Sequence, residues 1–257
     1  MLLALDIGNT QITIGVWDDE KLRCCIRMAT NRERTGDQYA AEIELLLRRA
    51  GIADGELTIA AISSVVPELT KDLALAAEQI IGGKPMVLGP GVKTGLAIRT
   101  DNPAELGADI VAACVAAKER FALPCLVADL GTATKLSVLN ADGKFIGCSI
   151  APGVGISLEA LSARASLLPA ISFSSAGRAI GPNTLESMTS GVVYGTAAML
   201  DGMVARMEKE LGIAFKSLVA TGGLSKDILP HCKRKFHYEP DLVLDGLRRI
   251  VLRLPKA

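Results

Sequence analysis

Two segments of the sequence combine a carboxylate with a turn of small residues, and both follow an apolar run. They are residues 6–10 (DIGNT) and residues 129–134 (DLGTAT). Phosphate groups bind to backbone N–H groups at close range, which small residues permit, and a carboxylate at a strand end can hold Mg²⁺ or its waters. One such turn alone is more often ordinary turn chemistry. Two copies in equivalent contexts favour a pair of phosphate-binding loops.

A third glycine cluster occurs late in the chain, in residues 221–225 (TGGLS), between an expected strand and an expected helix. It fits a tight β–α turn as well as a place where an adenine or a ribose could rest. The order of two phosphate loops followed by a Gly-Gly turn resembles that of actin-like ATPases and sugar kinases.

The segments around the two loops repeat each other. Residues 2–22 and residues 125–147 each contain an apolar run that ends in Asp, a small-residue turn, an alternating strand, an Asp-containing hairpin turn and another strand. The hairpin turn follows at a similar distance in both, from Asp6 to Asp18 and from Asp129 to Asp142. This internal repeat indicates two related halves, residues 1–100 and 101–257.

Helices and strands alternate between the repeats. Helical spacing is found at 37–50, from Pro103 through 120, at 157–168, at 189–211 and from 245 onward, and short β-rich runs at 58–66, 86–89 and 218–221. We therefore expect an α/β protein with largely parallel sheets, antiparallel opening hairpins and two domains that face a cleft.

The composition excludes several classes of protein. Lys plus Arg equals Asp plus Glu, at 28 each, so the overall charge recommends neither nucleic acid nor an anionic membrane as a partner. There is no long apolar run and no leader pattern, so we expect a soluble cytoplasmic protein. The six cysteines lack CxxC spacing and are expected to be buried thiols rather than metal ligands or disulfides. With histidine only at His231 and His237, a catalytic histidine is not expected.

Taken in order, nine strings across nearly the whole chain resemble the type III pantothenate kinase family. They are DIGNT, TNRERTGDQYA, SSVVP, GPGVKTG, DNPAELGAD, DLGTAT, APGVGISLEAL, GPNTLESMTSGVVYG and TGGL. The resemblance implies duplicated actin-like, ribonuclease H-like ATPase domains, a homodimer, and transfer of the ATP γ-phosphate to the hydroxyl of pantothenate, the first step of coenzyme A biosynthesis. It also implies Mg²⁺ and a monovalent cation, K⁺ or NH₄⁺.

The resemblance also assigns roles to residues. The ATP contacts that it implies are Asp6, Ile7, Gly8, Asn9, Thr10, Gln11, Ile12, Thr13 and Thr132, with Asp6 associated with Mg²⁺. The pantothenate contacts are Gly107, Ala108, Asp109, Ile110 and Thr184, with Asp109 as general base. Asp129 would be the K⁺ ligand, since a carboxylate beside a triphosphate is unfavourable unless a cation lies between them. From the residues alone, Asp109 could equally serve the dipole of the helix in which it lies.

Five positions depart from the commoner family pattern. Ile110 replaces an arginine, Lys135 a threonine, Pro182 a lysine, Cys148 a glycine and Thr100 a tyrosine. These changes lie mainly on the expected substrate side. They leave open a related non-kinase that binds nucleotide or regulates a partner, and a sugar kinase or actin-like ATPase of another family, although the chain is short and lacks a cysteine-rich zinc motif.

Overall fold

The computed structural model describes residues 1–171 and 177–255, which form two compact units. The first unit consists of Met1–Leu96, Asp101–Glu119 and the segment from Asp241 onward. The second consists of Ala97–Thr100 and Arg120–Pro240. These units do not coincide with the predicted halves, residues 1–100 and 101–257. The halves describe the internal repeat of the sequence and remain a prediction.

Each unit contains a five-stranded sheet, and the two sheets have the same topology. The first has the order β3-β2-β1-β4-β5, with β1 Leu2–Ile7, β2 Gln11–Asp18, β3 Lys21–Ala29, β4 Ile59–Ser64 and β5 Met86–Val87. The second has the order β10-β9-β6-β7-β8, with β6 Cys125–Leu130, β7 Ala133–Leu139, β8 Phe145–Pro152, β9 Ser217–Thr221 and β10 His237–Tyr238. In both, the first three strands are antiparallel and the other two are parallel to the first strand. The predicted α/β class with a repeated sheet is confirmed, but both sheets are mixed rather than largely parallel, because the antiparallel hairpins contribute half of the strand pairings.

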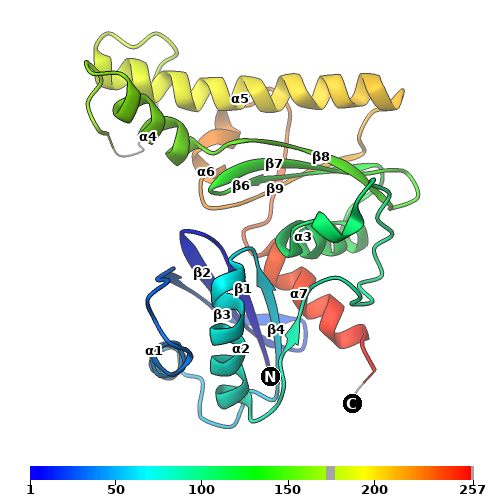
Figure 1. Ribbon diagram of the computed structural model, residues 1–257. Coiled ribbons are helices and arrows are strands. Elements are labelled where there is room, and N and C mark those ends of the chain that lie inside the picture. Colours follow the sequence, from blue (N-terminus) through cyan, green and yellow to red (C-terminus); the bar gives the residue numbers. More distant parts are fainter. Residues whose placement is uncertain (172–176, 256–257) are drawn as a thin grey trace. The chain divides into compact units, whose positions relative to one another are not determined.

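One face of the first sheet packs against two helices, α1 (Gly36–Arg49) and α2 (Pro67–Ile81), as Figure 1 shows. The apolar side chains of β1 that point to this face meet Tyr39 and Ile43 of α1 and Leu73 of α2, all fully buried. The helix α1 begins with a capping box, in which Thr35 and Gln38 satisfy each other's backbone N–H groups. Burial of this face provides the core of the first unit.

The opposite face carries a row of small residues, because Ala4 of β1 lies between Gly15 of β2 and Ala61 of β4. The helix α7 (Leu242–Arg253) packs on β1, β2 and β4 there. A Cβ at Gly15 would lie 2.9 Å from a methyl carbon at the end of the Leu244 side chain, so α7 packs closely over this glycine. The first unit also contains nearly all of α3 (Ala108–Arg120).

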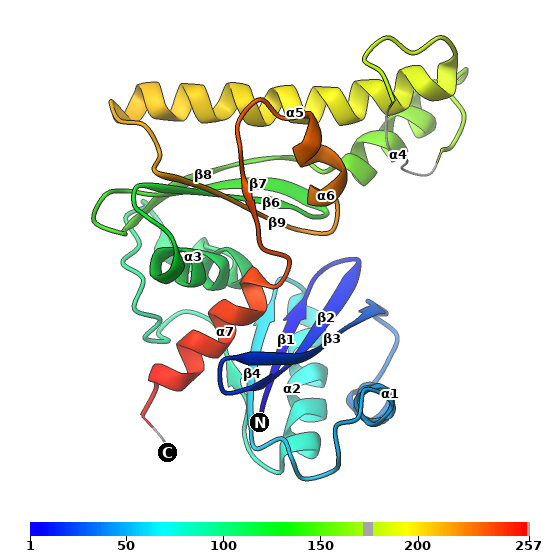
Figure 2. The same cartoon turned by 180° about the vertical axis from the view of Figure 1, so that it is seen from behind.

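In the second unit, the helices α4 (Val154–Arg164), α5 (Thr184–Leu211) and α6 (Ser225–Ile228) pack on one face of the second sheet. Figure 2 shows the 28-residue α5 lying along that face. Buried side chains of β6, β7 and β9 meet it, among them Leu126, Leu136 and Ala220. No helix among the described residues is both long enough and apolar enough to cross a membrane.

Two sequence predictions need correction. The helix expected to run on from Pro103 is a short 3₁₀ turn, Pro103–Glu105, and α3 begins only at Ala108, because Leu106 is extended with φ −69° and ψ 125°. The cysteines were expected to be buried, which holds for Cys114 and Cys125. Cys148 in β8 is exposed, and the other three are intermediate, namely Cys24, Cys25 and Cys232.

Candidate functional site

The first loop predicted to bind phosphate connects β1 with β2. Asp6 lies opposite Thr13, and the Gly8 N–H donates to the carbonyl oxygen of Gln11 over 3.0 Å. A Cβ at Gly8 would lie 2.9 Å from that oxygen, so the tight turn requires glycine. Asn9 and Thr10 are exposed at its tip, where a ligand can reach the backbone.

This loop is held by two residues that the sequence prediction did not assign. The hydroxyl of Thr30 donates to the Gly8 carbonyl over 2.6 Å, and Arg32 donates to the Asn9 side-chain oxygen over 2.9 Å and to Glu68 over 2.8 Å. Both residues belong to the string TNRERTGDQYA, which resembles the family but to which the resemblance assigns no site residue. Since Thr30 is 22 residues from Gly8, only the folded hairpin shows the contact.

Asp109 lies in the first turn of α3 and is 9% exposed, and its Oδ1 accepts the Ile110 N–H over 2.8 Å. A Cβ at Gly107 would lie 2.6 Å from that oxygen and 3.7 Å from a methyl carbon of Val65. The Val65 N–H in turn donates to the Ile7 carbonyl at the end of β1, over 3.0 Å. The turn that contains Asp109 therefore lies beside the carboxyl ends of β1 and β4, the sheet edge to which Asp6 also belongs.

Ala108 and Ile110, two further predicted pantothenate contacts, are buried beside Asp109. Thr184 belongs to the second unit, where it is the exposed first residue of α5, and Asn183 caps that helix by accepting the Glu186 N–H over 2.9 Å. The predicted pantothenate residues are thus divided between the two units.

The second predicted phosphate loop connects β6 with β7 and meets two other glycine turns. The Gly153 N–H donates to the Thr132 carbonyl over 3.2 Å, and a Cβ at Gly153 would overlap that carbonyl. Gly222 has a φ of +94°, and a Cβ there would lie 2.5 Å from backbone atoms of Leu130. The loop of Thr132, the start of α4 and the late Gly-Gly turn are therefore neighbours within the second unit, with Thr132 itself exposed.

Asp129, the predicted K⁺ ligand, forms an ion pair with Lys135. The Lys135 ammonium lies 2.7 Å from Oδ2 of Asp129, and the two side chains are 16% and 21% exposed. The charge of Lys135 also acts on Cys148 of β8. Although this residue is exposed, partial desolvation of its sulfur raises the pKa of the thiol, and the positive charge of Lys135 opposes that shift. Two departures from the family pattern, Lys135 and Cys148, thus lie within electrostatic reach of each other.

The edge around Asp6 has the donor chemistry that Mg²⁺ prefers. Ser63 of β4 lies beside Asp6 in the parallel register, and its buried hydroxyl oxygen has no hydrogen-bond partner among the described residues. A carboxylate and a hydroxyl are hard oxygen donors, and protein Mg²⁺ sites commonly use one or two carboxylates together with substrate phosphates. No group of three or more His, Cys, Asp or Glu in the described ranges could hold a metal by itself. The residues present fit a Mg²⁺ ion that arrives with a nucleotide.

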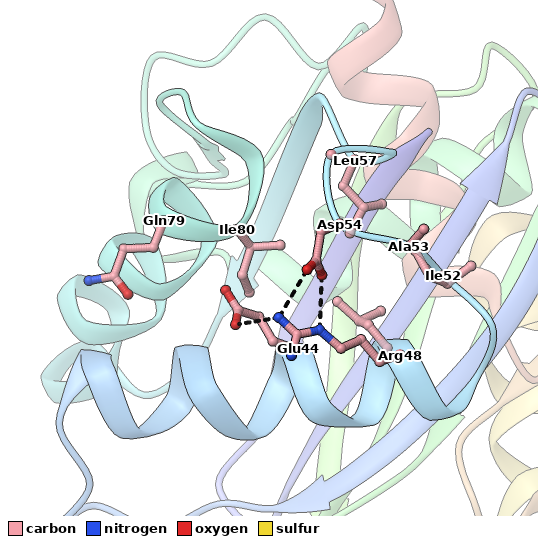
Figure 3. A pocket seen from close by; sticks show the side chains of 10 residues that line it. Glu44, Arg48, Ile52, Ala53, Asp54, Leu57, Gln79 and Ile80 are labelled. Carbon is pink, nitrogen blue, oxygen red and sulfur yellow. Dashed lines mark hydrogen bonds and ion pairs between the residues drawn. The ribbon is translucent and has the colours of Figure 1, made fainter.

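A separate pocket of about 320 Å³ lies in the first unit between α1, α2 and the segment that precedes β4 (Figure 3). Arg48 donates to both carboxylate oxygens of Asp54, over 2.9 and 3.1 Å, and lies 3.7 Å from Glu44. The charged groups drawn there are thus paired with one another. The pocket is at the amino-terminal end of β4, opposite to the edge that contains Asp6, and none of its lining residues is a predicted site residue.

The repeated sheets, each with a glycine-containing loop after its first strand, define an actin-like ATPase and sugar kinase fold. A candidate N-acetylmannosamine kinase from Listeria monocytogenes is similar in structure, with a TM-score of 0.52 at 12% identity over 98% of both chains. A conserved candidate transcriptional activator of the Baf family from Campylobacter jejuni has a TM-score of 0.62 at 18% identity over 97% of both. At these identities the likeness shows the fold alone.

Sequence similarity identifies the family. The family model for type III pantothenate kinase matches residues 2–206. The type III pantothenate kinase of Myxococcus xanthus is 42% identical over 97% of this chain and 97% of its own. The chain therefore belongs to the type III pantothenate kinase family.

Proposed function

We propose that the protein transfers the γ-phosphate of ATP to the hydroxyl of pantothenate, the first step of coenzyme A biosynthesis. The observation that carries this proposal is the 42% identity to a type III pantothenate kinase over 97% of the chain. The non-kinase alternative is not favoured, because the family is one of kinases and the chain keeps Asp6, Asp109 and both glycine loops. We also propose the cytoplasm as its compartment.

ATP binding is assigned to the two loops. Within residues 6–13, the exposed backbone at Asn9 and Thr10, together with the turn at Thr132, would bind phosphate oxygens. The N–H groups of Gly8 and Gly131 already donate within their turns, to the carbonyl oxygens of Gln11 and Ala133, and the lack of side chains at these glycines lets phosphate approach. Asp6, directly or through water, and Ser63 would hold Mg²⁺, which when bound neutralises charge on the phosphate oxygens. The hydrogen bonds of Thr30 and Arg32 would fix the conformation of the first loop for this contact.

Asp109 is proposed as the general base. It would accept the proton of the pantothenate hydroxyl as the bond between that oxygen and phosphorus forms. Its position in the first turn of α3, next to the edge that contains Asp6, places it in the same unit as the proposed Mg²⁺ ligand. Gly107 and Ala108 would shape the substrate turn, Ile110 would give it an apolar wall, and Thr184 would contribute a hydroxyl.

The decisive experiment offers the purified protein ATP, Mg²⁺ and either pantothenate or a panel of small hydroxyl compounds, with the products identified by mass spectrometry. We expect phosphopantothenate and no other phosphorylated product. Asp6→Asn should lower the rate because it weakens the hold on Mg²⁺. ATP binding without a product from any acceptor would replace the kinase assignment with the regulatory alternative.

A further inference from the structure

The ion pair between Asp129 and Lys135 follows from strand register. The two residues lie directly opposite each other in the antiparallel pair of β6 and β7. Their neighbours Ala128 and Leu136 point to the other face, which packs under α4 and α5. Asp129 and Lys135 therefore share the face that those helices do not cover, where cross-strand partners have their Cβ atoms in close proximity.

The two oxygens of Asp129 have different surroundings. Oδ2 lies 2.7 Å from the Lys135 ammonium, while Oδ1 lies 3.5 Å from the position of a Cβ at Gly131, in the turn proposed to bind phosphate. The carboxylate thus connects the ammonium group with the loop. Since both side chains are mostly buried, water screens their attraction less than at an exposed surface.

A K⁺ ion at Asp129 does not fit this arrangement. The carboxylate is already neutralised by a cation within hydrogen-bond distance, and K⁺ bound to the same group would be repelled by the ammonium charge. Lys135 is the residue that stands where the commoner family pattern has a neutral threonine. The substitution therefore changes the charge at the place where the family resemblance implies a free monovalent cation.

We propose that Lys135 is a covalently attached replacement for the monovalent cation, so that the enzyme binds and uses ATP without K⁺ or NH₄⁺. The ammonium removes the repulsion between Asp129 and a polyphosphate bound at the loop of Gly131 and Thr132. This inference rests on the proposed function for its turnover measurements, but its effect on ATP affinity is independent of the acceptor.

The test compares the natural protein with Lys135→Thr at constant ionic strength, in choline chloride and in KCl. The natural protein should change by less than about twofold in both ATP affinity and turnover. Lys135→Thr should bind ATP at least about tenfold more weakly in choline, and KCl or NH₄Cl should restore most of the loss, because a free cation can then reach Asp129. ATP affinity is measured by calorimetry without pantothenate, and turnover by product formation.

Two further variants make the result specific. Lys144→Thr removes another lysine of the second unit that pairs with an aspartate, Asp142 at 2.9 Å, and should stay independent of K⁺. Lys135→Gln replaces Lys135→Thr if the melting temperature shows that the threonine variant is unfolded. Activation of the natural protein by K⁺ of more than about tenfold, or a folded Lys135 variant that remains indifferent to K⁺, overturns the proposal. Absence of phosphopantothenate with normal K⁺-independent ATP binding would refute only the proposed acceptor.

Discussion

Gly246 of α7 lies against the carbonyl group of Ala112 in α3, so close that a Cβ at position 246 would overlap the carbonyl carbon and oxygen. Both residues are buried. Neither helix can move away easily, because α7 also packs on the first sheet and each of the first ten residues of α3 is buried. This contact sets the distance between the two helices.

Gly246→Ala should therefore destabilise the protein by about 2 kcal/mol or more, although alanine is the better helix former by about 1 kcal/mol. Thermal unfolding followed by circular dichroism measures the effect. Gly155→Ala in α4 is the matched control, because a Cβ there meets no atom within 4 Å, and it should cost nothing. Equal melting temperatures for the two variants would show that α3 and α7 separate without penalty.

Asp109→Asn tests the general base. Asparagine has nearly the same shape but cannot take the proton, so kcat should fall by roughly 10²- to 10⁴-fold while ATP affinity stays close to that of the natural protein. The lower end is favoured, because a loose transition state depends less on deprotonation of the nucleophile.

The competing role of Asp109, at the start of a helix, predicts a different outcome: a loss of a fraction of a kcal/mol in stability with little change in rate. Measuring kcat, ATP affinity and melting temperature on one preparation separates the two. Asp142→Asn, in an exposed hairpin, is the control and should match the natural protein in kcat. A nearly full kcat for Asp109→Asn would end its assignment as base.

The pair of Glu208 and Arg234 should make the second unit sensitive to acid. Hydrogen bonds from Arg234, over 2.6 and 2.8 Å, hold the pKa of Glu208 below its usual value, assisted by the Phe215 N–H and opposed by burial. A carboxyl whose pKa is lowered by folding stabilises the protein above its unfolded-state pKa of about 4.3, and the contribution is lost as pH falls through the folded value.

Glu208→Gln should therefore lower the free energy of unfolding at pH 7 by about 1 kcal/mol, and its difference from the natural protein should shrink as pH falls below about 4. Urea unfolding at a series of pH values gives both quantities. A difference that stayed constant down to pH 3 would assign the cost to packing rather than to charge.

We propose that the protein forms the homodimer that the family resemblance implies, and α5 offers a face for it. Gly191, Gly195 and Ala198 are exposed at helical spacing, whereas Ala197 is buried in the second unit. Light scattering should give about twice the chain mass of 26.9 kDa. Gly195→Arg should shift the mass to that of the monomer, because a Cβ at Gly195 meets no atom within 4 Å in its own chain and the variant should still fold. Leu45→Arg, on the exposed face of α1, is the control and should leave the mass unchanged. A monomer mass for the natural protein at micromolar concentration would exclude the dimer.

The sequence predicted the repeated hairpins well, because alternating strands and Asp-containing turns are local patterns. It does not predict the helix α2, because Pro67 directly follows the β-rich run at 58–66 and is compatible with the end of a strand, whereas proline is also favoured at the first position of a helix. It also missed β10, a two-residue strand too short to show any periodicity. Local signals therefore predicted the repeated hairpins but neither the helix α2 nor the edge strand β10.

For the candidate site, the sequence predicts the glycine turns and its family resemblance predicts Asp109, while neither predicts the contacts that hold them. Thr30 meets Gly8 only after the hairpin forms, and the sequence shows Lys135 only as a departure from the family pattern. The register of β6 and β7 provides that partner, because it places Lys135 opposite Asp129. Pairings of this kind depend on geometry between strands, which composition and spacing do not contain.

The row of Ala4, Gly15 and Ala61 has a consequence for synthesis on the ribosome. Its strands are complete within the first 64 residues, but the helix that covers the row begins at Leu242. During translation this smooth face stays uncovered until roughly 180 further residues have been made, a span in which exposed apolar surface favours aggregation. The first unit therefore cannot bury this row until its last segment has been made, whereas nearly all of the second unit, Arg120–Pro240, is contiguous in the sequence.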